Sequence, residues 1–241
     1  MAQLFGTGTI KSHTEVLSGF DEAKISLIQK LHQDWKNGLL AGETEYEQTF
    51  NQLFFGELLG YEDRSNRIPK GAVAGTGIAD LTLGYFKEGK YDPENVQIVC
   101  ELKGAKTNLV KKQFGHGGLS PVGQGFSYKT GFKNCKRLIV SNFYEIRLYR
   151  DNQTDFEVWT LDELSDSKDN YFNLRKLYLL LHRDNLLTHT GKSKTEDLLS
   201  HFREEQKEIT AKFYKGYKTL RVELINDMKQ RNPGTGIEIL I

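Results

Sequence analysis

The stretches 79–86 (ADLTLGYF) and 96–103 (VQIVCELK) decide the fold, because both are short runs of apolar and β-branched residues. The segment between them, KEGKYDPEN, contains the Gly, Asp and Pro that favour turns. This pattern predicts two strands joined as a hairpin. Three further runs of the same kind, at 137–142, 145–150 and 155–160, predict more strands.

Helical patterns surround these strands. Apolar residues recur at three- and four-residue steps over 21–40 and about 43–59, and a shorter helix is expected from Pro121 to about Asn134. Residues 161–184 also favour a helix, whereas 64–77 turns to Gly, Ala, Asn and Pro and indicates a loop. The combined order of helices and strands predicts an α/β fold.

The stretch 195–228 differs from the rest in its charge. Apolar side chains recur there at helical spacing within a heavily charged sequence that contains no turn signal. We interpret it as a long amphipathic helix, or a pair of helices, that extends from the main domain.

Composition sets wider bounds. The 241 residues suffice for one large domain with an extension, and 38% hydrophobic residues can form a core. A formal net charge of +1 means that any affinity for nucleic acid must come from a local surface. Two cysteines without a CxxC pair indicate a reducing compartment, and no apolar run approaches membrane-spanning length. We therefore expect a cytoplasmic protein that does not enter a membrane.

The ends of the two decisive strands carry the charges of interest. Glu101 and Lys103 are two residues apart, so they point to the same face of a strand, about 6.6 Å apart along the backbone. If the strands pair, Asp80 joins them. Two carboxylates beside an ammonium suit a Mg²⁺ site that hydrolyses a phosphodiester. Taken alone, such a triplet is more often a set of solvated strand-end charges.

Three more polar residues accompany this group. Gln124 and Tyr128 are one helical turn apart and share a face of the helix that follows Pro121. Glu47 shares the face of Phe50 in its own predicted helix, although a carboxylate beside an apolar stripe is costly without a task. Individually, Gln124 would be explained as a surface amide and Tyr128 as a core aromatic residue.

In this order, Glu47, Asp80, the ELK triplet at 101–103 and the QGFSY segment at 124–128 resemble the PD-(D/E)XK nuclease superfamily, in the branch with a QxxxY motif. The sequence from about 43 to 150 is similar to the amino-terminal nuclease region of type IIG restriction-modification enzymes. The helical tail also resembles these enzymes, but less closely. One departure is Ala79, where the family pattern has proline before the aspartate.

The resemblance implies a restriction-endonuclease-like core, with a mixed central sheet flanked by helices and a C-terminal helical extension. It implies an amino-terminal arm over 1–20, a nuclease domain over 21–190 and a helical linker over 191–241. Asp80 and Glu101 would hold Mg²⁺, for which Mn²⁺ can substitute, and Lys103 would orient or deprotonate the attacking water. Glu47 would complete the acidic site, with Gln124 and Tyr128 in supporting roles. The implied activity is metal-dependent cleavage of double-stranded DNA.

The implied partners include parts that these residues do not contain. A glycine-rich S-adenosylmethionine turn and an Asn-Pro-Pro-aromatic tetrapeptide are missing, so we expect this chain to be a fragment whose methyltransferase and target-recognition regions follow. S-adenosylmethionine would serve only that missing part. Two alternatives stay open: the nuclease domain of a type I restriction subunit, and a catalytically silent PD-(D/E)XK module that binds DNA. Cleavage through a dimer also stays open.

One stretch of the chain is basic throughout. Residues 103–137 contain eight Lys or Arg and no Asp or Glu. This predicts a surface for the phosphate backbone beside the metal site, although an ordinary solvated face is the alternative. The residues expected to contact DNA are Lys106, Lys111, Lys112, Lys129 and Lys133.

Overall fold

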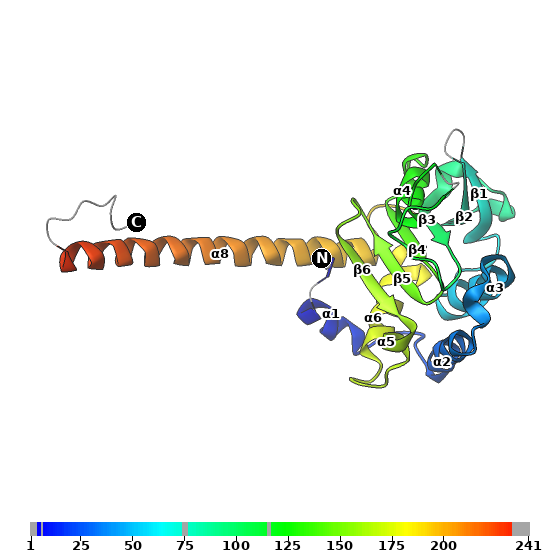
Figure 1. Ribbon diagram of the computed structural model, residues 1–241, viewed down its shortest axis with the longest axis horizontal. Helices are drawn as coiled ribbons and strands as arrows, with labels where there is room; N and C mark the ends of the chain where they lie inside the picture. The colour runs from blue at the N-terminus through cyan, green and yellow to red at the C-terminus, as the bar shows by residue number, and fades with distance from the viewer. Residues whose placement is uncertain (1–3, 6, 74–76, 115–116, 233–241) are drawn as a thin grey trace. The chain divides into compact units, whose positions relative to one another are not determined.

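The structure is a computed structural model, which describes residues 4–5, 7–73, 77–114 and 117–232. Within them, six strands form one sheet in the order of the chain (Figure 1). The parallel pair is β3 with β4, and the other neighbours are antiparallel, so the sheet is mixed. The strands are β1 (Arg67–Val73), β2 (Gly77–Gly84), β3 (Val96–Leu102), β4 (Arg137–Ser141), β5 (Glu145–Tyr149) and β6 (Phe156–Thr160).

The predicted hairpin is confirmed. β2 and β3 pair antiparallel with Leu81 opposite Cys100 and Thr82 opposite Val99. This register places Asp80 and Glu101 on the same face of the sheet, because side chains alternate along both strands. The three downstream strands are confirmed as β4, β5 and β6.

The prediction of a loop over 64–77 is wrong, because most of that stretch is β1. Its residues pair with β2, for example Pro69 with Leu81 and Gly71 with Ala79. β1 is an edge strand, the position in a sheet where a proline is tolerated. Gly71 is also required there, since a Cβ at this position would lie 2.4 Å from the Thr82 Cγ2 atom.

The two amino-terminal helices are present but interrupted. The α2 helix starts at the Asp21 cap, whose carboxylate accepts a hydrogen bond from the Lys24 N–H, and α3 continues into a π-helical segment. This part of the chain comprises α1 (Thr7–Thr14), α2 (Glu22–Lys36), the 3₁₀ turn η1 (Leu39–Ala41), α3 (Glu43–Phe50) and the π-helix η2 (Asn51–Leu58). Two further 3₁₀ turns, η3 (Lys87–Gly89) and η4 (Pro93–Asn95), lie between β2 and β3.

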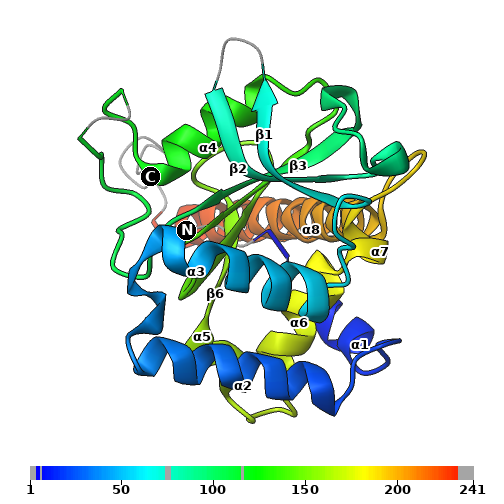
Figure 2. The same ribbon diagram turned by 90° about the vertical axis from the view of Figure 1, so that its right-hand side faces the viewer.

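The helix after Pro121 is confirmed as α4 (Pro121–Thr130), which ends earlier than predicted. Ser120 caps it by accepting a hydrogen bond from the Gly123 N–H at 3.1 Å, and Pro121 occupies the first turn. The α4 helix connects the parallel strands β3 and β4, as such a connection requires. Figure 2 shows α4 on one side of the strands, with α2 and α3 on the other side.

The prediction of one continuous helix over 161–184 is wrong. The stretch is divided into α5 (Leu161–Ser165), α6 (Phe172–Leu181) and α7 (Arg183–Leu186). Asp169, Asn170 and Tyr171 all have positive φ angles, which no α-helix accommodates. His182, with ψ of 139°, separates α6 from α7.

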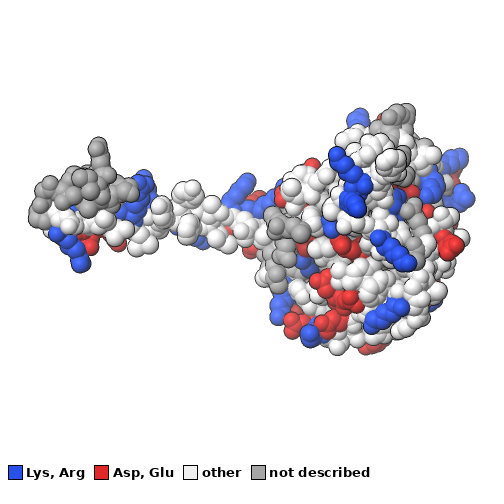
Figure 3. Space-filling view, viewed as in Figure 1, with Lys and Arg blue, Asp and Glu red and all other residues white. Residues whose placement is uncertain are grey.

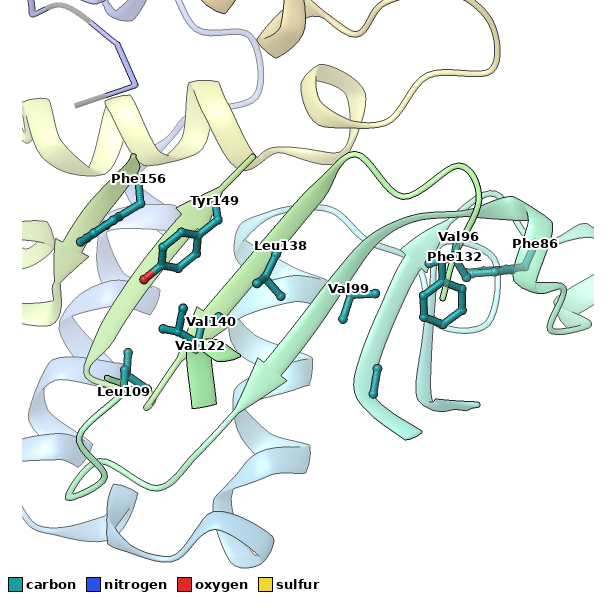
Figure 4. Packing of buried hydrophobic residues seen from close by; sticks show 11 residues of the cluster. Phe86, Val96, Val99, Leu109, Val122, Phe132, Leu138, Val140, Tyr149 and Phe156 are labelled. Carbon is teal, nitrogen blue, oxygen red and sulfur yellow. The ribbon is translucent and has the colours of Figure 1, made fainter. Parts of the chain in front are cut away.

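One apolar cluster joins α4 to the sheet (Figure 4). Val99, Leu138 and Val140 come from adjacent strands and are fully buried together with Val122 of α4. The approach of α4 is close, since a Cβ at Gly125 would lie 2.7 Å from the Leu138 Cδ1 atom. Glu101 lies two residues after Val99 in β3, so both side chains point to the sheet face that α4 covers.

The chain divides into two units, residues 1–198 and 199–241. Most described residues of the second unit belong to α8 (Lys194–Arg231), which confirms one long helix rather than a pair. Its large apolar side chains are exposed, including Ile209, Phe213, Tyr217, Leu220 and Leu224. In the part of the chain that the structure describes, no helix combines the length and the apolar character needed to cross a membrane. The expected limits of arm, nuclease domain and linker stay predictions.

Candidate active site

Asp80, Glu101 and Lys103 meet at one point. The Lys103 ammonium lies 2.7 Å from Glu101 Oε1 and 3.5 Å from Asp80 Oδ2, and it donates a hydrogen bond to the Leu102 carbonyl at 2.9 Å. Asp80 Oδ2 also accepts a hydrogen bond from the Leu102 N–H at 2.9 Å. Both carboxylates therefore contact the same cation, as the shared strand faces predicted.

This arrangement is almost closed to solvent. Glu101 is 1% exposed and Lys103 is 5% exposed, whereas the Asp80 side chain is 13% exposed. The contact between the Glu101 carboxylate and the Lys103 ammonium offsets the cost of burying each group. Asp80 is the member of the group that reaches toward the surface.

The donor set around the Lys103 ammonium suits a divalent metal. Three oxygens converge on it, from Asp80, Glu101 and the Leu102 carbonyl, and hard oxygen ligands are those that Mg²⁺ prefers. A divalent ion would use these oxygens beside the ammonium. Among the described residues, no group of three or more His, Cys, Asp or Glu side chains is positioned as a ready-made metal cluster. A metal here would rely on two carboxylates, a carbonyl and solvent, as Mg²⁺ sites commonly do.

Glu47 reaches the same group through a second lysine. The Lys70 ammonium lies 3.1 Å from Glu47 Oε1 and 2.9 Å from Asp80 Oδ1. Burial lowers the pKa of Lys70, but its hydrogen bonds to Asp80 and Glu47 outweigh that effect, so the pKa is raised above its ordinary value. Asp80 therefore faces one ammonium with each of its two oxygens.

Lys70 was not predicted as a site residue, because it lies in the stretch predicted to be a loop. It stands on β1 between Pro69 and Gly71, whose partners Leu81 and Ala79 flank Asp80. Its φ of 54° places it in the left-handed region, which a residue with a side chain adopts only when its surroundings enforce it. The only available signal was a lysine beside Pro69 and Gly71, and that signal has no specificity.

Gln124 and Tyr128 lie on one face of α4 and bond to each other. The Gln124 amide donates to the Tyr128 hydroxyl at 2.6 Å, and a Cβ at Gly77 of β2 would lie 2.9 Å from Tyr128 Cε1. Gln124 Oε1 is buried and accepts no hydrogen bond from the described residues. The pair thus lies beside the strand that carries Asp80. The expectation that both side chains project toward Lys103 stays a prediction.

The basic stretch 103–137 does not act as one surface. Arg137 is buried in an ion pair with Glu196, and Lys129 donates a hydrogen bond to the Arg150 carbonyl and lies over the Phe126 ring. Burial lowers the pKa of Lys129. Four of the lysines expected to contact DNA remain exposed, namely Lys106, Lys111, Lys112 and Lys133. On the side of the body that Figure 3 shows, Lys and Arg are scattered rather than gathered.

A cleft of about 850 Å³ opens beside Glu47. Its lining combines Glu47 and Gln48 of α3 with Arg67 of β1 and with Tyr91. Glu47 belongs both to the cleft and to the carboxylate group, whereas Asp80, Glu101 and Lys103 do not line the cleft.

The cysteines are unsuited to nucleophilic roles. Cys100 is buried, and burial raises its pKa well above the ordinary value. Burial also raises the pKa of Cys135 to about 12. A thiol must ionise to attack, so neither group competes with the carboxylate site as a reaction centre.

Comparisons with protein-family models, with curated proteins and with solved structures found no match to this chain.

Proposed function

We propose that this chain is a metal-dependent DNA endonuclease domain that hydrolyses phosphodiester bonds. The observation that carries the proposal is the convergence of Asp80, Glu101 and the Leu102 carbonyl on the Lys103 ammonium. Two carboxylates, a backbone oxygen and a lysine are the parts that phosphodiester hydrolysis with Mg²⁺ requires. They are supplied by two paired strands, so they are held rigidly.

The arrangement of elements supports a PD-(D/E)XK core. The chain runs from α3 through β1, β2 and β3 to α4 and β4, which agrees with the αβββαβ order of that superfamily. Glu47 lies on the first helix, Asp80 on the second strand, Glu101 at the end of the third and Gln124 on the following helix. From the sequence resemblance of residues 43–150 we propose a type IIG restriction system, with a methyltransferase and a target-recognition region as partners. From the composition we propose the cytoplasm as its location.

Each residue has a task in this proposal. Asp80 and Glu101 would hold Mg²⁺ or Mn²⁺, which lowers the pKa of bound water and stabilises the charge that develops on the phosphate. Lys103 would orient the attacking water or, in its neutral form, accept the proton that the water loses. Glu47 adds a third carboxylate next to Asp80 through Lys70. Gln124 and Tyr128 would position Lys103, the water or the phosphate, and they bond to each other on one face of α4.

The alternatives differ in what they require. A type I restriction subunit would carry the same site, so it shares the proposed chemistry and differs in the domains that follow. A silent DNA-binding module needs no buried lysine between two carboxylates. Burying these charges costs desolvation energy, and a module without catalytic activity would gain no chemistry from them. The intact charged group therefore favours an active enzyme.

Replacing Asp80 with asparagine tests the proposal. We expect the wild type to nick supercoiled plasmid slowly, without sequence preference, in Mg²⁺ or Mn²⁺ and not in a chelator. The Asp80→Asn protein should lose at least about 100-fold of that rate, because a ligand charge and the partner of two ammonium groups disappear. Asp166→Asn, a change remote in sequence and 41% exposed, is the matched control and should cut normally. Equal nicking by all three proteins would reject the site.

The exposed lysines predict how DNA binding depends on salt. Removing Lys111 and Lys112 together should reduce the slope of log K against log salt by about two, since each phosphate contact releases about 0.9 counterions. Lys129→Ala should leave the slope unchanged, because its ammonium is already bonded to the Arg150 carbonyl. Fluorescence anisotropy with a labelled duplex at several salt concentrations measures both. An effect of Lys129→Ala as large as that of the double variant would contradict this assignment.

A further inference from the structure

Two lysines flank a single carboxylate in the candidate site. Lys70 contacts Asp80 Oδ1 at 2.9 Å, whereas Lys103 faces Asp80 Oδ2 at 3.5 Å. We propose that Lys70 is a built-in cation that occupies the place of a second metal ion between Glu47 and Asp80, so that the site binds one divalent metal. This inference rests on the proposed function and specifies the metal content of that same site.

The geometry resembles a two-ion site in which lysine has replaced one ion. In such sites two metals lie about 3.5–4 Å apart and share a bridging carboxylate. Here Asp80 is the bridge, and each of its oxygens meets a different cationic group. The oxygens of Glu47 and Glu101 also contact different ammonium groups. Both Glu47 oxygens face Lys70, at 3.1 and 3.2 Å, and Glu101 Oε1 faces Lys103 at 2.7 Å.

The two cationic places differ in burial. The Lys103 side chain is 6% exposed and is enclosed by three oxygens, whereas the Lys70 side chain is 55% exposed and lies at the edge strand. The Lys70 ammonium can retain solvent on its open side while it contacts both carboxylates. An ion that binds beside Glu101 would therefore leave the Lys70 ammonium in place.

The charges of the group favour a single divalent ion. Three carboxylates against two ammonium groups leave one negative charge, and one divalent ion changes this to one positive charge. That charge complements the single negative charge of a phosphodiester. A second divalent ion would leave an excess of three positive charges in a partly buried place, which is costly.

The backbone holds Lys70 at this position. Lys70 lies opposite Asp80, because its neighbours Pro69 and Gly71 pair with Leu81 and Ala79, and its φ of 54° lies in the left-handed region. Such a conformation at a residue with a side chain indicates that the surroundings determine it. The contacts with Glu47 and Asp80 are the interactions that this placement provides.

Counting bound Mn²⁺ tests the inference without any cleavage assay. Mn²⁺ is titrated into the full 241-residue chain, and the bound ions are counted by calorimetry and by the electron paramagnetic resonance signal of the free ion. We expect one ion in the wild type and one in Lys70→Arg, which keeps the cation. Two ions are expected in Lys70→Met and in Lys70→Gly, both of which open the place between Glu47 and Asp80.

Several controls separate folding from metal content. Glycine adopts the positive φ of position 70 without strain, so Lys70→Gly keeps the test valid if Lys70→Met folds poorly. Lys90→Met, at an 81% exposed lysine that pairs with Glu88, should bind one ion. Asp80→Asn should remove the ion from the wild-type site.

The outcomes distinguish this inference from the proposed function. Two ions in the wild type, or one in both Lys70→Met and Lys70→Gly, would overturn the role of Lys70 and leave the nuclease site intact. No ion in the wild type, or an ion that Asp80→Asn does not remove, would overturn the metal site itself and the inference with it.

Discussion

Replacing Lys103 with alanine should abolish cleavage and leave most DNA binding. Lys103 is the ammonium that touches both Asp80 and Glu101, whereas binding draws on the exposed lysines of the basic stretch. We expect a fall in the nicking rate of about 10²–10⁴-fold, the usual contribution of a group that transfers a proton to or from the reacting water. The dissociation constant for a short duplex should change by less than about threefold, since one buried lysine contributes little to counterion release.

A second substitution separates chemistry from folding at this position. Lys103→Ala leaves the Glu101 carboxylate, 1% exposed, without this ammonium, and breaking a buried ion pair in this way costs about 3–5 kcal/mol. Lys103→Arg keeps a positive charge beside Glu101, but a guanidinium does not release its proton near neutral pH. We expect Lys103→Arg to fold and still to cut at least about 100-fold more slowly. Wild-type nicking by both variants would place the reaction centre elsewhere.

Replacing Lys176 with methionine should destabilise the domain by about 3–5 kcal/mol. The Lys176 ammonium donates to Glu157 Oε2 at 2.6 Å, and Glu157 Oε1 accepts the Phe5 N–H at 2.8 Å. The two side chains are 9% and 2% exposed. Methionine fills the space of the lysine stem but leaves the carboxylate buried between β6 and α6 with one backbone partner.

Urea unfolding followed by tryptophan fluorescence measures this loss. Both tryptophans lie within residues 1–198, and Lys176 lies 6.0 Å from the centre of the Trp159 ring, so the signal reports on the right unit. Lys168→Met is the matched control, because that lysine is 89% exposed and should change stability by less than about 0.5 kcal/mol. Adding Glu157→Gln to Lys176→Met should recover part of the loss. Equal stability of the two lysine variants would show that the buried pair contributes nothing.

Local patterns were sufficient for the central part of the fold. The strands β2 to β6 follow from apolar and β-branched runs, and α4 begins at Pro121 because Ser120 caps it. These features depend on neighbours in the chain, which is why periodicity and capping reveal them. The same alternation predicted that Asp80, Glu101 and Lys103 share a sheet face, and the structure brings their charged groups into contact.

Other features were decided by contacts between residues distant in the chain. β1 is a strand because β2 supplies its hydrogen bonds, although Pro69 and Gly71 disfavour a strand locally. The break between α5 and α6 depends on left-handed residues at 169–171, a conformation that their side chains do not dictate. Local sequence patterns therefore do not predict the structure where contacts between distant residues override local preference.

The site shows the same division. The sequence by itself determined which carboxylates and which lysine line the end of the hairpin, because strand alternation is a local rule. Only the tertiary structure decided which lysines face that site. Lys129 donates a hydrogen bond to the Arg150 carbonyl and is less exposed than the other lysines. Lys70 lies between Glu47 and Asp80 because it belongs to β1, an edge strand that the sequence did not predict. Charged residues follow no sequence periodicity that predicts their partners, so each partner depends on which surfaces the fold brings together.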